Sequence, residues 1–487
     1  MRDDIHRDEW YELRSQHIQL TTDVPLDRAQ EYIRELEQSW RALTMMYVVI
    51  APWATPPDAL FPVIHLSSCS DYHDIGLKNS IGFVFSSRVF NGERFVVTCE
   101  QPNGNHSIFL HELTHILNGR CIPLAPPWVN EGLAMYFETM EMTDGRVVVG
   151  KLPPSREYLW RTPALLPKLP DLLGLDNAAF RDDQNARYYL AAWKLVHLLN
   201  NTSQDYRNRL RGYLAMLNGD HVRKDAWEQA FHGIPPERLA EEYGVYQQRP
   251  KLLLWTASYK LENPPAATVR QLRAGEAHVV WAHLLSRVSW EAALRQIDLA
   301  AQADRFWPDV FYWRALLLPW SRRPGADEQA AAALREYRSR RPEDTRGWHL
   351  LLDRELDRVV PADHLGLEDI APAGIEDLEP IAKGLVARAQ KPYDLNTAAW
   401  YYAMARQADT GLPLAIQSVQ RDPGCADCWD TLALLYFQKG DVARARLAQE
   451  RAVNMYGDGR ILPGVRLRLQ RYRAAASAAL PASVDAR

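Results

Sequence analysis

Alternating and periodic apolar positions divide the first part of the chain into short strands and helices. Residues 15–22 alternate polar and apolar side chains, as a half-buried strand does. In residues 26–36 the apolar positions recur at helical spacing and share one face. The stretches 62–66, 81–85 and 94–99 are predicted strands, and a long helix is expected from about Ser107. A small sheet followed by helices predicts an α+β fold.

The pattern changes in the middle of the chain. Residues 145–180 are rich in loops, with a predicted hairpin at 145–150 followed by several prolines. Helical periodicity returns at Arg187 and continues to the end, and no convincing strand is found after residue 250. We therefore place a domain boundary near 250, which gives a first domain of residues 1–250 and an all-α domain of residues 251–487.

The C-terminal half contains an internal repeat of 34 residues. Its recurring positions are Leu395 with Trp429, Ala399 with Ala433, and Tyr402 with Tyr436, followed by Gly440, Ala445 and Ala452. Pro423 precedes Trp429 by the same six residues that separate Pro342 from Trp348. This pattern resembles tetratricopeptide (TPR) repeats, most clearly over 392–459, with a weaker echo around 311–348. In such repeats small residues let paired helices approach, and Trp and Tyr fill the groove between neighbours. Ordinary amphipathic helices are the alternative, and a stronger one for 260–390.

Length and charge narrow the class of protein. With 487 residues, 47% hydrophobic and 24% charged, the chain has the profile of a soluble globular protein of two or three domains. Its net charge of −4 gives no global reason to expect binding to nucleic acid or anionic membranes. No apolar run approaches the roughly 20 residues of a membrane span. Residues 1–7 are charged and lack the apolar core of a signal peptide. A cytoplasmic protein is therefore expected from the chain as given, or a periplasmic or secreted one if a leader was removed.

Five cysteines are too few for a disulfide framework in a chain of this length. Cys69, Cys99 and Cys121 are isolated in the sequence. Cys425 and Cys428 form one CxxC, which lacks the second pair of ligands of a zinc site. We expect the pair to pack in a helix turn, with a redox pair and half a metal site as alternatives.

One short motif carries candidate chemistry, the HExxH sequence of residues 111–115. On a helix, His111 and His115 are stacked one turn apart, so both imidazoles can reach one ion. Glu112 emerges beside that ion at a different angle, which is the position of a general base acting on water. The alternative is an amphipathic helix with two partly exposed histidines, because HExxH also arises by chance.

The next segment supplies a third ligand. After Gly119 and a loop comes Pro126-Pro127-Trp128-Val129-Asn130-Glu131-Gly132-Leu133-Ala134. Prolines suit the first turn of a helix, and a helix running back along the first would present Glu131 to the same ion. Gly132 and Ala134 are small, as close contact between helices requires. Two histidines, a glutamate and a water make a catalytic zinc site with an open position.

The two segments, HELTH and PPWVNEGLAMYFE, are similar to those of gluzincin metallopeptidases, specifically the peptidase-MA-like domains that often carry C-terminal TPR repeats. The resemblance covers about residues 10–245. It implies a zincin-like fold with one Zn²⁺ per chain held by His111, His115 and Glu131, and with Glu112 as the base. The interval of fifteen residues between His115 and Glu131 is shorter than in thermolysin-like enzymes. An aminopeptidase is disfavoured because the Gly-x-Met-Glu-Asn motif has no equivalent.

The resemblance also suggests secondary site residues. In gluzincins a Tyr or His from a later helix steadies the oxyanion, and Tyr189, four residues before a Trp, matches that position. Tyr188 is its competitor, and packing of Tyr189 in the core is the alternative. Helical spacing alone places Glu138 two turns beyond Glu131 on the same face, where it either orients a ligand imidazole or is a solvated surface residue. His197 is expected to pack and not to serve as a fourth ligand. By family analogy, the strand at 94–99 could pair its edge with an extended peptide.

The sequence therefore predicts zinc-dependent peptide-bond hydrolysis, with Glu112 as the general base and Tyr189 as the oxyanion donor. Substrates would be peptides or proteins, and the helical-repeat domain would recruit a substrate or a protein partner. One alternative is a catalytically weak or inactive zinc-binding scaffold whose TPR-like domain mediates protein–protein interaction, and another is hydrolysis of a different bond. The intact Glu112 favours catalysis.

Overall fold

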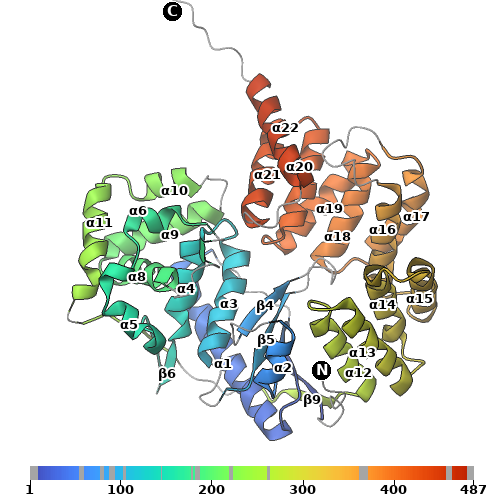
Figure 1. Ribbon diagram of the computed structural model, residues 1–487. Helices are drawn as coiled ribbons and strands as arrows, with labels where there is room; N and C mark the ends of the chain where they lie inside the picture. Colours follow the sequence, from blue (N-terminus) through green and yellow to red (C-terminus); the bar gives the residue numbers. More distant parts are fainter. Residues whose placement is uncertain are drawn as a thin grey trace, which may run out of the picture. The chain divides into compact units, whose positions relative to one another are not determined.

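The computed structural model describes residues 9–53, 60–76, 82–86, 94–101, 106–143, 145–176, 179–180, 187–218, 223–249, 251–259, 264–360, 371–456 and 463–479. The chain divides into two compact units, and the division after the last strand of the first unit lies between Leu272 and Arg273. The first unit combines a mixed sheet with helices, and the described part of the second, from Arg273 onwards, is helical (Figure 1). The α+β class is confirmed.

A six-stranded mixed sheet forms the base of the first unit, in the order β4-β5-β3-β2-β1-β9. Its strands are β1 (Tyr11–Arg14), β2 (Ile18–Thr22), β3 (Phe61–Leu66), β4 (Gly82–Ser86), β5 (Arg94–Cys99) and β9 (Thr268–Gln271). The neighbours β2, β3 and β5 run parallel, whereas β4, β1 and β9 pair antiparallel. The central strands β3 and β5 are buried almost continuously, as parallel strands covered on both faces are. The predicted strands at 62–66 and 94–99 are confirmed, and so are residues 82–85 of the strand predicted at 81–85, whose first residue lies outside the described residues.

Helices and a smaller sheet complete the first unit. The helices are α1 (Leu26–Ile50), α2 (Cys69–Asp74), α3 (His106–Cys121), α4 (Pro127–Glu138), α5 (Glu157–Trp160), α6 (Leu169–Gly174), α8 (Arg187–Asn201), α9 (Gln204–Asn218), α10 (Arg223–Ala230) and α11 (Pro236–Val245). The smaller sheet has the order β6-β7-β8, with β6 (Glu141–Thr143), β7 (Arg146–Val149) and β8 (Trp255–Ser258). A hairpin is present, but β6 and β7 form it over residues 141–149, so the predicted range 145–150 covers only part of its turn and its second strand. Gly145 lies in the turn with a φ of 78°, a value that suits glycine.

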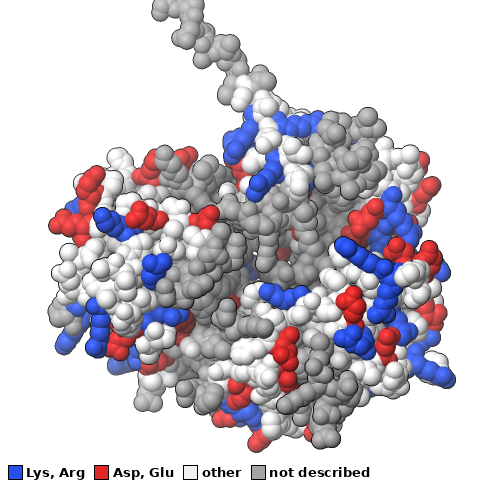
Figure 2. Space-filling view, viewed as in Figure 1, with Lys and Arg blue, Asp and Glu red and all other residues white. Residues whose placement is uncertain are grey.

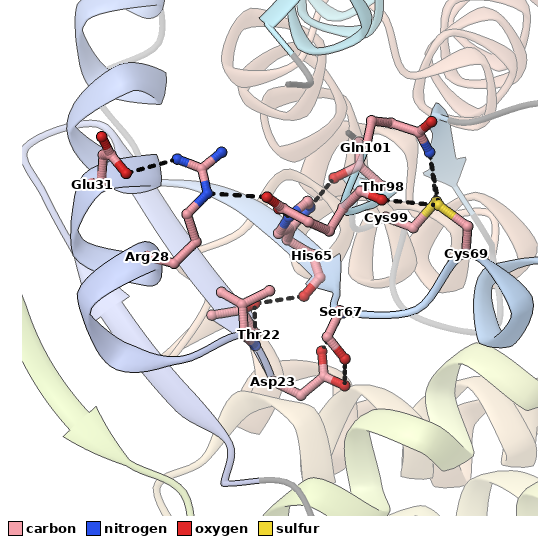
Figure 3. A network of polar contacts seen from close by, with 12 residues as sticks. Thr22, Asp23, Arg28, Glu31, His65, Ser67, Cys69, Thr98, Cys99 and Gln101 are labelled. Atoms are coloured by element: carbon pink, nitrogen blue, oxygen red, sulfur yellow. Dashed lines mark hydrogen bonds and ion pairs between the residues drawn. A yellow bond between two sulfur atoms is a disulfide. The ribbon is translucent and has the colours of Figure 1, made fainter. Parts of the chain in front are cut away.

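The carboxyl ends of β3 and β5 are tied together by a polar network (Figure 3). His65, buried at the end of β3, contacts Thr98 Oγ1 through Nδ1 at 2.8 Å and Glu100 Oε2 through Nε2 at 2.7 Å. Arg28 on α1 donates from Nε to Glu100 Oε1 at 3.0 Å. Hydrogen bonding to His65, with help from Arg28, lowers the pKa of Glu100 to about 2. The chain leaving β5 towards α3 is thereby fixed to both β3 and α1.

A disulfide reinforces the same edge. Cys69 at the start of α2 is bonded to Cys99 at the end of β5, and Gln101 Nε2 donates to both sulfurs, at 2.7 and 3.2 Å. The expectation that Cys69 and Cys99 are isolated is therefore wrong, because the fold brings two positions distant in sequence to neighbouring strand ends. Cys425 and Cys428 are buried and also bonded, and Cys121 is a free, buried thiol.

The second unit is a succession of helices. They are α12 (Ala274–Leu285), α13 (Trp290–Ala303), α14 (Pro308–Leu317), α15 (Ala326–Arg340), α16 (Thr345–Val359), α17 (Glu379–Val386), α18 (Pro392–Met404), α19 (Ala408–Arg421), α20 (Ala426–Gln438), α21 (Val442–Tyr456) and α22 (Pro463–Ala479), with the 3₁₀ turn η5 (Leu318–Ser321) after α14. Helix α20 begins 34 residues after α18, and α21 begins 34 residues after α19. The sequence repeat thus corresponds to two successive helix pairs.

Two strands after residue 250 contradict the expectation that none occurs there. β8 pairs with β7, and β9 pairs with β1 from Tyr11 to Arg14. Both strands are short and largely exposed, so they carry little hydrophobic signal. Hydrogen bonding to distant partners, which a local pattern does not encode, keeps them in the first unit.

Surface charge is mixed. Lysine and arginine are interspersed with aspartate and glutamate over most of the described face in Figure 2. Within the described residues, every helix is too short or too polar to cross a membrane.

The Cys69–Cys99 bridge gives a first prediction. Replacing both residues with Ala should lower the free energy of unfolding of the first unit by about 2–4 kcal/mol, because the unfolded chain regains freedom that the bridge removes. Urea unfolding without reductant measures the loss. Thiol counting on the wild type, denatured without reductant, should find only Cys121 reactive.

The control repeats both unfolding curves in reductant. In reductant the wild type also loses the bridge. The difference in free energy of unfolding between the two proteins should then shrink to the cost of truncating the two side chains. Equal stability of the two proteins without reductant would show that the bridge contributes nothing.

Candidate metal centre

Helix α3 presents its histidines by burying the opposite side. Phe109, Leu110, Leu113 and Leu117 are at most 1% exposed. His111 and His115 are only partly covered, at 16% and 18% side-chain exposure. The helix continues to Cys121, so Asn118 and Gly119 lie in its last turn.

Helix α4 brings a carboxylate to the same place. Pro126 and Pro127 begin the helix without a side-chain cap. A Cβ added to Gly132 would lie 2.7 Å from the backbone oxygen of Ala192 on α8. Glycine is therefore required where α4 and α8 touch, and that contact holds the turn carrying Glu131.

Asn118 joins the helices around the centre. Its Oδ1 accepts a hydrogen bond from the Tyr47 hydroxyl of α1 at 2.7 Å. Its Nδ2 donates to the backbone oxygen and Oδ1 of Asn130 on α4, at 3.1 and 3.0 Å. Asn118 is 1% exposed. Sequence reasoning did not identify Asn118 as part of the centre. The available signal was its position two turns after His111, with a second asparagine, Asn130, directly before Glu131.

Three ligand atoms converge on one point. His111 Nε2 and His115 Nε2 are 3.1 Å apart, and Glu131 Oε2 is 3.7 and 3.4 Å from them. The point equidistant from the corners of such a triangle lies roughly 2 Å from each, which matches the bond lengths of zinc to nitrogen and oxygen. The sequence-predicted trio is therefore brought together in a geometry that could hold a metal.

The chemistry of the atoms fits the same conclusion. Glu131 Oε2 is buried and faces only the two imidazoles, His111 Nε2 at 3.7 Å and His115 Nε2 at 3.4 Å, which is longer than an ordinary hydrogen bond. His111 Nδ1 lies 2.8 Å from Glu138 Oε2. A proton on Nδ1 leaves the Nε2 lone pair directed at Glu131, so Glu138 orients this imidazole. Of the two interpretations of Glu138, the structure supports the orienting one.

Charge within the cluster shifts its pKa values. Burial lowers the pKa of His111, but Glu131 and Glu138 outweigh it and raise that pKa well above its ordinary value. Burial likewise lowers the pKa of His115, and the charge of Glu131 reverses the shift. Burial raises the pKa of Glu131, yet the two imidazoles bring it far below the usual range. Without a metal, the cluster therefore holds protons.

Glu112 lies next to the cluster but outside it. It is close enough to raise the pKa of both imidazoles by its charge. A Cβ added to Gly82 on β4 would lie 3.3 Å from Glu112 Cγ and 2.2 Å from Ile108 Cγ2. The end of β4 thus runs directly beside Glu112. Gly82 was missed, although a glycine opening a hydrophobic strand signals close approach.

The prediction that the strand at 94–99 offers a free edge to a peptide is wrong. β5 (Arg94–Cys99) is paired on both sides, with β3 and with β4, so its backbone groups are engaged. β4 is the terminal strand of the sheet. A local pattern identifies strands but not their order, which is why the two were confused.

The remaining candidates lie on α8. Tyr189 is one turn before Ala192, the residue that meets Gly132, and its ring centroid is 5.7 Å from that of Phe180. The ring of Tyr188 also packs on Phe180, at 5.8 Å. His197 belongs to another cluster, with Nδ1 2.6 Å from the Tyr246 hydroxyl, and burial lowers its pKa to about 4.

Comparison with known proteins adds no relative. No family model matches the chain, and a search of curated proteins finds no match.

The charge of the cluster predicts a pH-dependent metal affinity. Binding must displace the protons of His111 and His115, whose pKa values are raised. Affinity for Zn²⁺ or Co²⁺ should therefore be lost as pH falls, by roughly tenfold per pH unit for each proton displaced. Competition titrations between about pH 6 and 8 measure the slope.

Two variants control this experiment. Glu131→Ala removes a ligand and should abolish tight binding at every pH. Glu138→Gln removes one carboxylate that raises the pKa of His111, so it should flatten the slope while weakening binding roughly 10–100-fold. If the metal affinity of the wild type did not depend on pH, His111 and His115 would not be the ligands that release protons on binding.

Proposed function

We propose that the first unit is a zinc-dependent peptidase of the gluzincin type with a zincin-like fold. The observation that supports it is the triangle of His111 Nε2, His115 Nε2 and Glu131 Oε2, whose dimensions suit one zinc ion. Three protein ligands leave a position open for a water, as in catalytic rather than structural sites.

The proposed chemistry assigns a task to each side chain. When bound, zinc polarises a carbonyl and lowers the pKa of water to about 7. Glu112 accepts the proton of the attacking water on its carboxylate and passes it to the leaving amine. Glu138 keeps His111 in the tautomer that binds metal. Tyr189, on the helix that packs beside Glu131, is the proposed oxyanion donor, with Tyr188 as the alternative.

We place the substrate along β4. A terminal strand offers unpaired N–H and C=O groups that an extended peptide can join. At Gly82 this strand passes so near the Glu112 side chain that an added Cβ would lie 3.3 Å from Glu112 Cγ. A peptide added to β4 would therefore pass the general base, which favours peptides and unfolded protein segments as substrates.

The second unit is proposed to be a TPR-like array that recruits a partner or substrate. Trp348 Nε1 donates to the Pro342 oxygen at 2.8 Å, and Trp429 Nε1 donates to the Pro423 oxygen at 2.9 Å. Equivalent residues thus make equivalent bonds in the clear repeat and in its weaker echo.

Close helix packing supports the same proposal. A Cβ on Gly411 of α19 would lie 2.9 Å from Leu435 of α20. The corresponding residue one repeat later, Ala445, is fully buried.

The disulfides bear on the compartment. Such bridges persist in oxidising environments and are rare in the cytosol. We therefore propose the exported alternative, periplasmic or secreted, over the cytoplasmic one. Thiol counting on protein alkylated before lysis distinguishes the two compartments. An exported protein should show only Cys121 alkylated, and a cytoplasmic one should show all five cysteines alkylated.

The role of Glu112 gives a direct test. Glu112→Gln keeps the size of the side chain but cannot accept the proton of water, so hydrolysis of a peptide library should fall by about 10²–10⁴-fold. Zinc content should stay unchanged, because Glu112 is not a ligand. Glu241→Gln, an exposed glutamate on α11, is the matched control. If the variant keeps its activity, Glu112 is not the base, and an inactive wild type would favour the scaffold alternative.

Gly82 tests the path of the substrate. Gly82→Ala adds a methyl group against Ile108 and Glu112, so turnover should fall while zinc content is retained. Ile108→Ala in the same chain should restore part of the activity by opening the space. Gly212→Ala, at a helical position with nothing within 4 Å, should leave turnover unchanged. Normal activity of Gly82→Ala would separate β4 from catalysis.

A further inference from the structure

A groove in the second unit has no part in the chemistry described so far. It encloses about 590 Å³ between α13, η5, α14 and α15. Leu294, Leu318 and Ala333 line it with buried apolar side chains. We name it the α13–α15 groove. Its volume lies within the range of pockets that hold small ligands and side chains.

The charges along the groove are not balanced. Asp298 is paired with Arg314 at 2.8 Å, and Glu336 is paired with Arg340 at 2.6 Å. Both carboxylates of the groove are thus neutralised by neighbours. Arg323, which also lines it and is exposed, makes no ion pair within 4 Å with any described residue, although its charge helps to lower the pKa of the exposed Glu291 on α13. One guanidinium remains for a carboxylate from outside.

A stacked tryptophan pair, of which one member is exposed, lies on two of the elements that line the groove. Trp290 and Trp320 are stacked with ring centroids 5.2 Å apart, and Trp320 is 50% exposed. Trp290 is one turn before Leu294 on α13, and Trp320 follows Leu318 by two residues. Exposed tryptophan next to arginine is the composition of energetic centres in protein interfaces. A single exposed apolar residue needs no explanation, whereas a stacked pair beside a recess indicates a partner.

From these contacts we infer that the α13–α15 groove binds a protein segment that carries a carboxylate beside an aromatic or large aliphatic side chain. The apolar side chain enters between Leu294, Leu318 and Ala333, the carboxylate pairs with Arg323, and the tryptophans cover the segment. Nucleic acid is disfavoured because backbone phosphates require several cations in a row. A membrane is disfavoured because the apolar floor is recessed. The inference extends the recruiting role proposed above and does not depend on hydrolysis.

The test is selection of a random peptide library on the full-length Glu112→Gln protein, which keeps captured peptides from being cleaved. Selected peptides should share an acidic residue next to an aromatic or large aliphatic one. Synthetic versions should quench the fluorescence of the tryptophan pair on binding. Trp320→Ala should weaken binding at least about tenfold, and Arg323→Glu should change the selected residue from acidic to basic.

The matched control is Arg295→Glu. Arg295 is exposed on the same helix, is unpaired among the described residues and does not line the groove, so its reversal should leave the selection unchanged. Circular dichroism establishes that each variant folds.

Several outcomes would overturn the inference. They are equal effects of Arg323→Glu and Arg295→Glu, a library with no shared motif, or Trp320-dependent binding to anionic vesicles or an RNA oligonucleotide in place of peptides. Wild-type hydrolysis without groove binding would remove this inference alone, and groove binding by an inactive wild type would remove only the peptidase proposal.

Discussion

A carboxylate buried against two imidazoles is the constraint on which the first unit depends. An isolated buried carboxylate is strongly disfavoured, and Glu131 is tolerated because His111 and His115 face it within 4 Å. Protons or a metal ion can satisfy the same three atoms. The distance between helices α3 and α4 therefore decides whether these three atoms can meet.

Small residues set this spacing on two sides. Gly132 lets α8 reach α4, and Gly82 lets β4 reach α3. The network of His65, Glu100 and Arg28, together with the Cys69–Cys99 bridge, fixes the strand ends from which the chain enters α3. These features belong to different parts of the sequence. Gly132 positions α4, whereas Gly82, the polar network and the disulfide all act on α3.

The sequence predicted what local periodicity and short motifs encode. Strands at 62–66, 81–85 and 94–99, the convergence of His111, His115 and Glu131, and the 34-residue repeat all depend on spacing along the chain. The order of strands, the pairing of Cys69 with Cys99 and the return of β8 and β9 to the first unit depend on contacts between distant segments. Hydrophobic patterning is silent on these because an exposed four-residue strand such as β9 resembles a loop. Glu138 is intermediate between the two cases, because helical spacing placed it on the same face as Glu131 but did not decide where its carboxylate points.

Asn118 also exposes the centre to chemical ageing. It precedes Gly119, and an Asn-Gly step is prone to deamidation because glycine does not hinder attack of its backbone nitrogen on the side-chain amide. Asparagine is accordingly among the residues that limit lifetime at high temperature. In the folded protein, helix α3 and the bonds to Tyr47 and Asn130 hold the amide away from that attack. Deamidation in an unfolded chain would replace the donating Nδ2 by an oxygen facing the oxygens of Asn130, so α3 and α4 would repel each other where they now bond. Each excursion from the folded state therefore carries a risk that the centre does not form again.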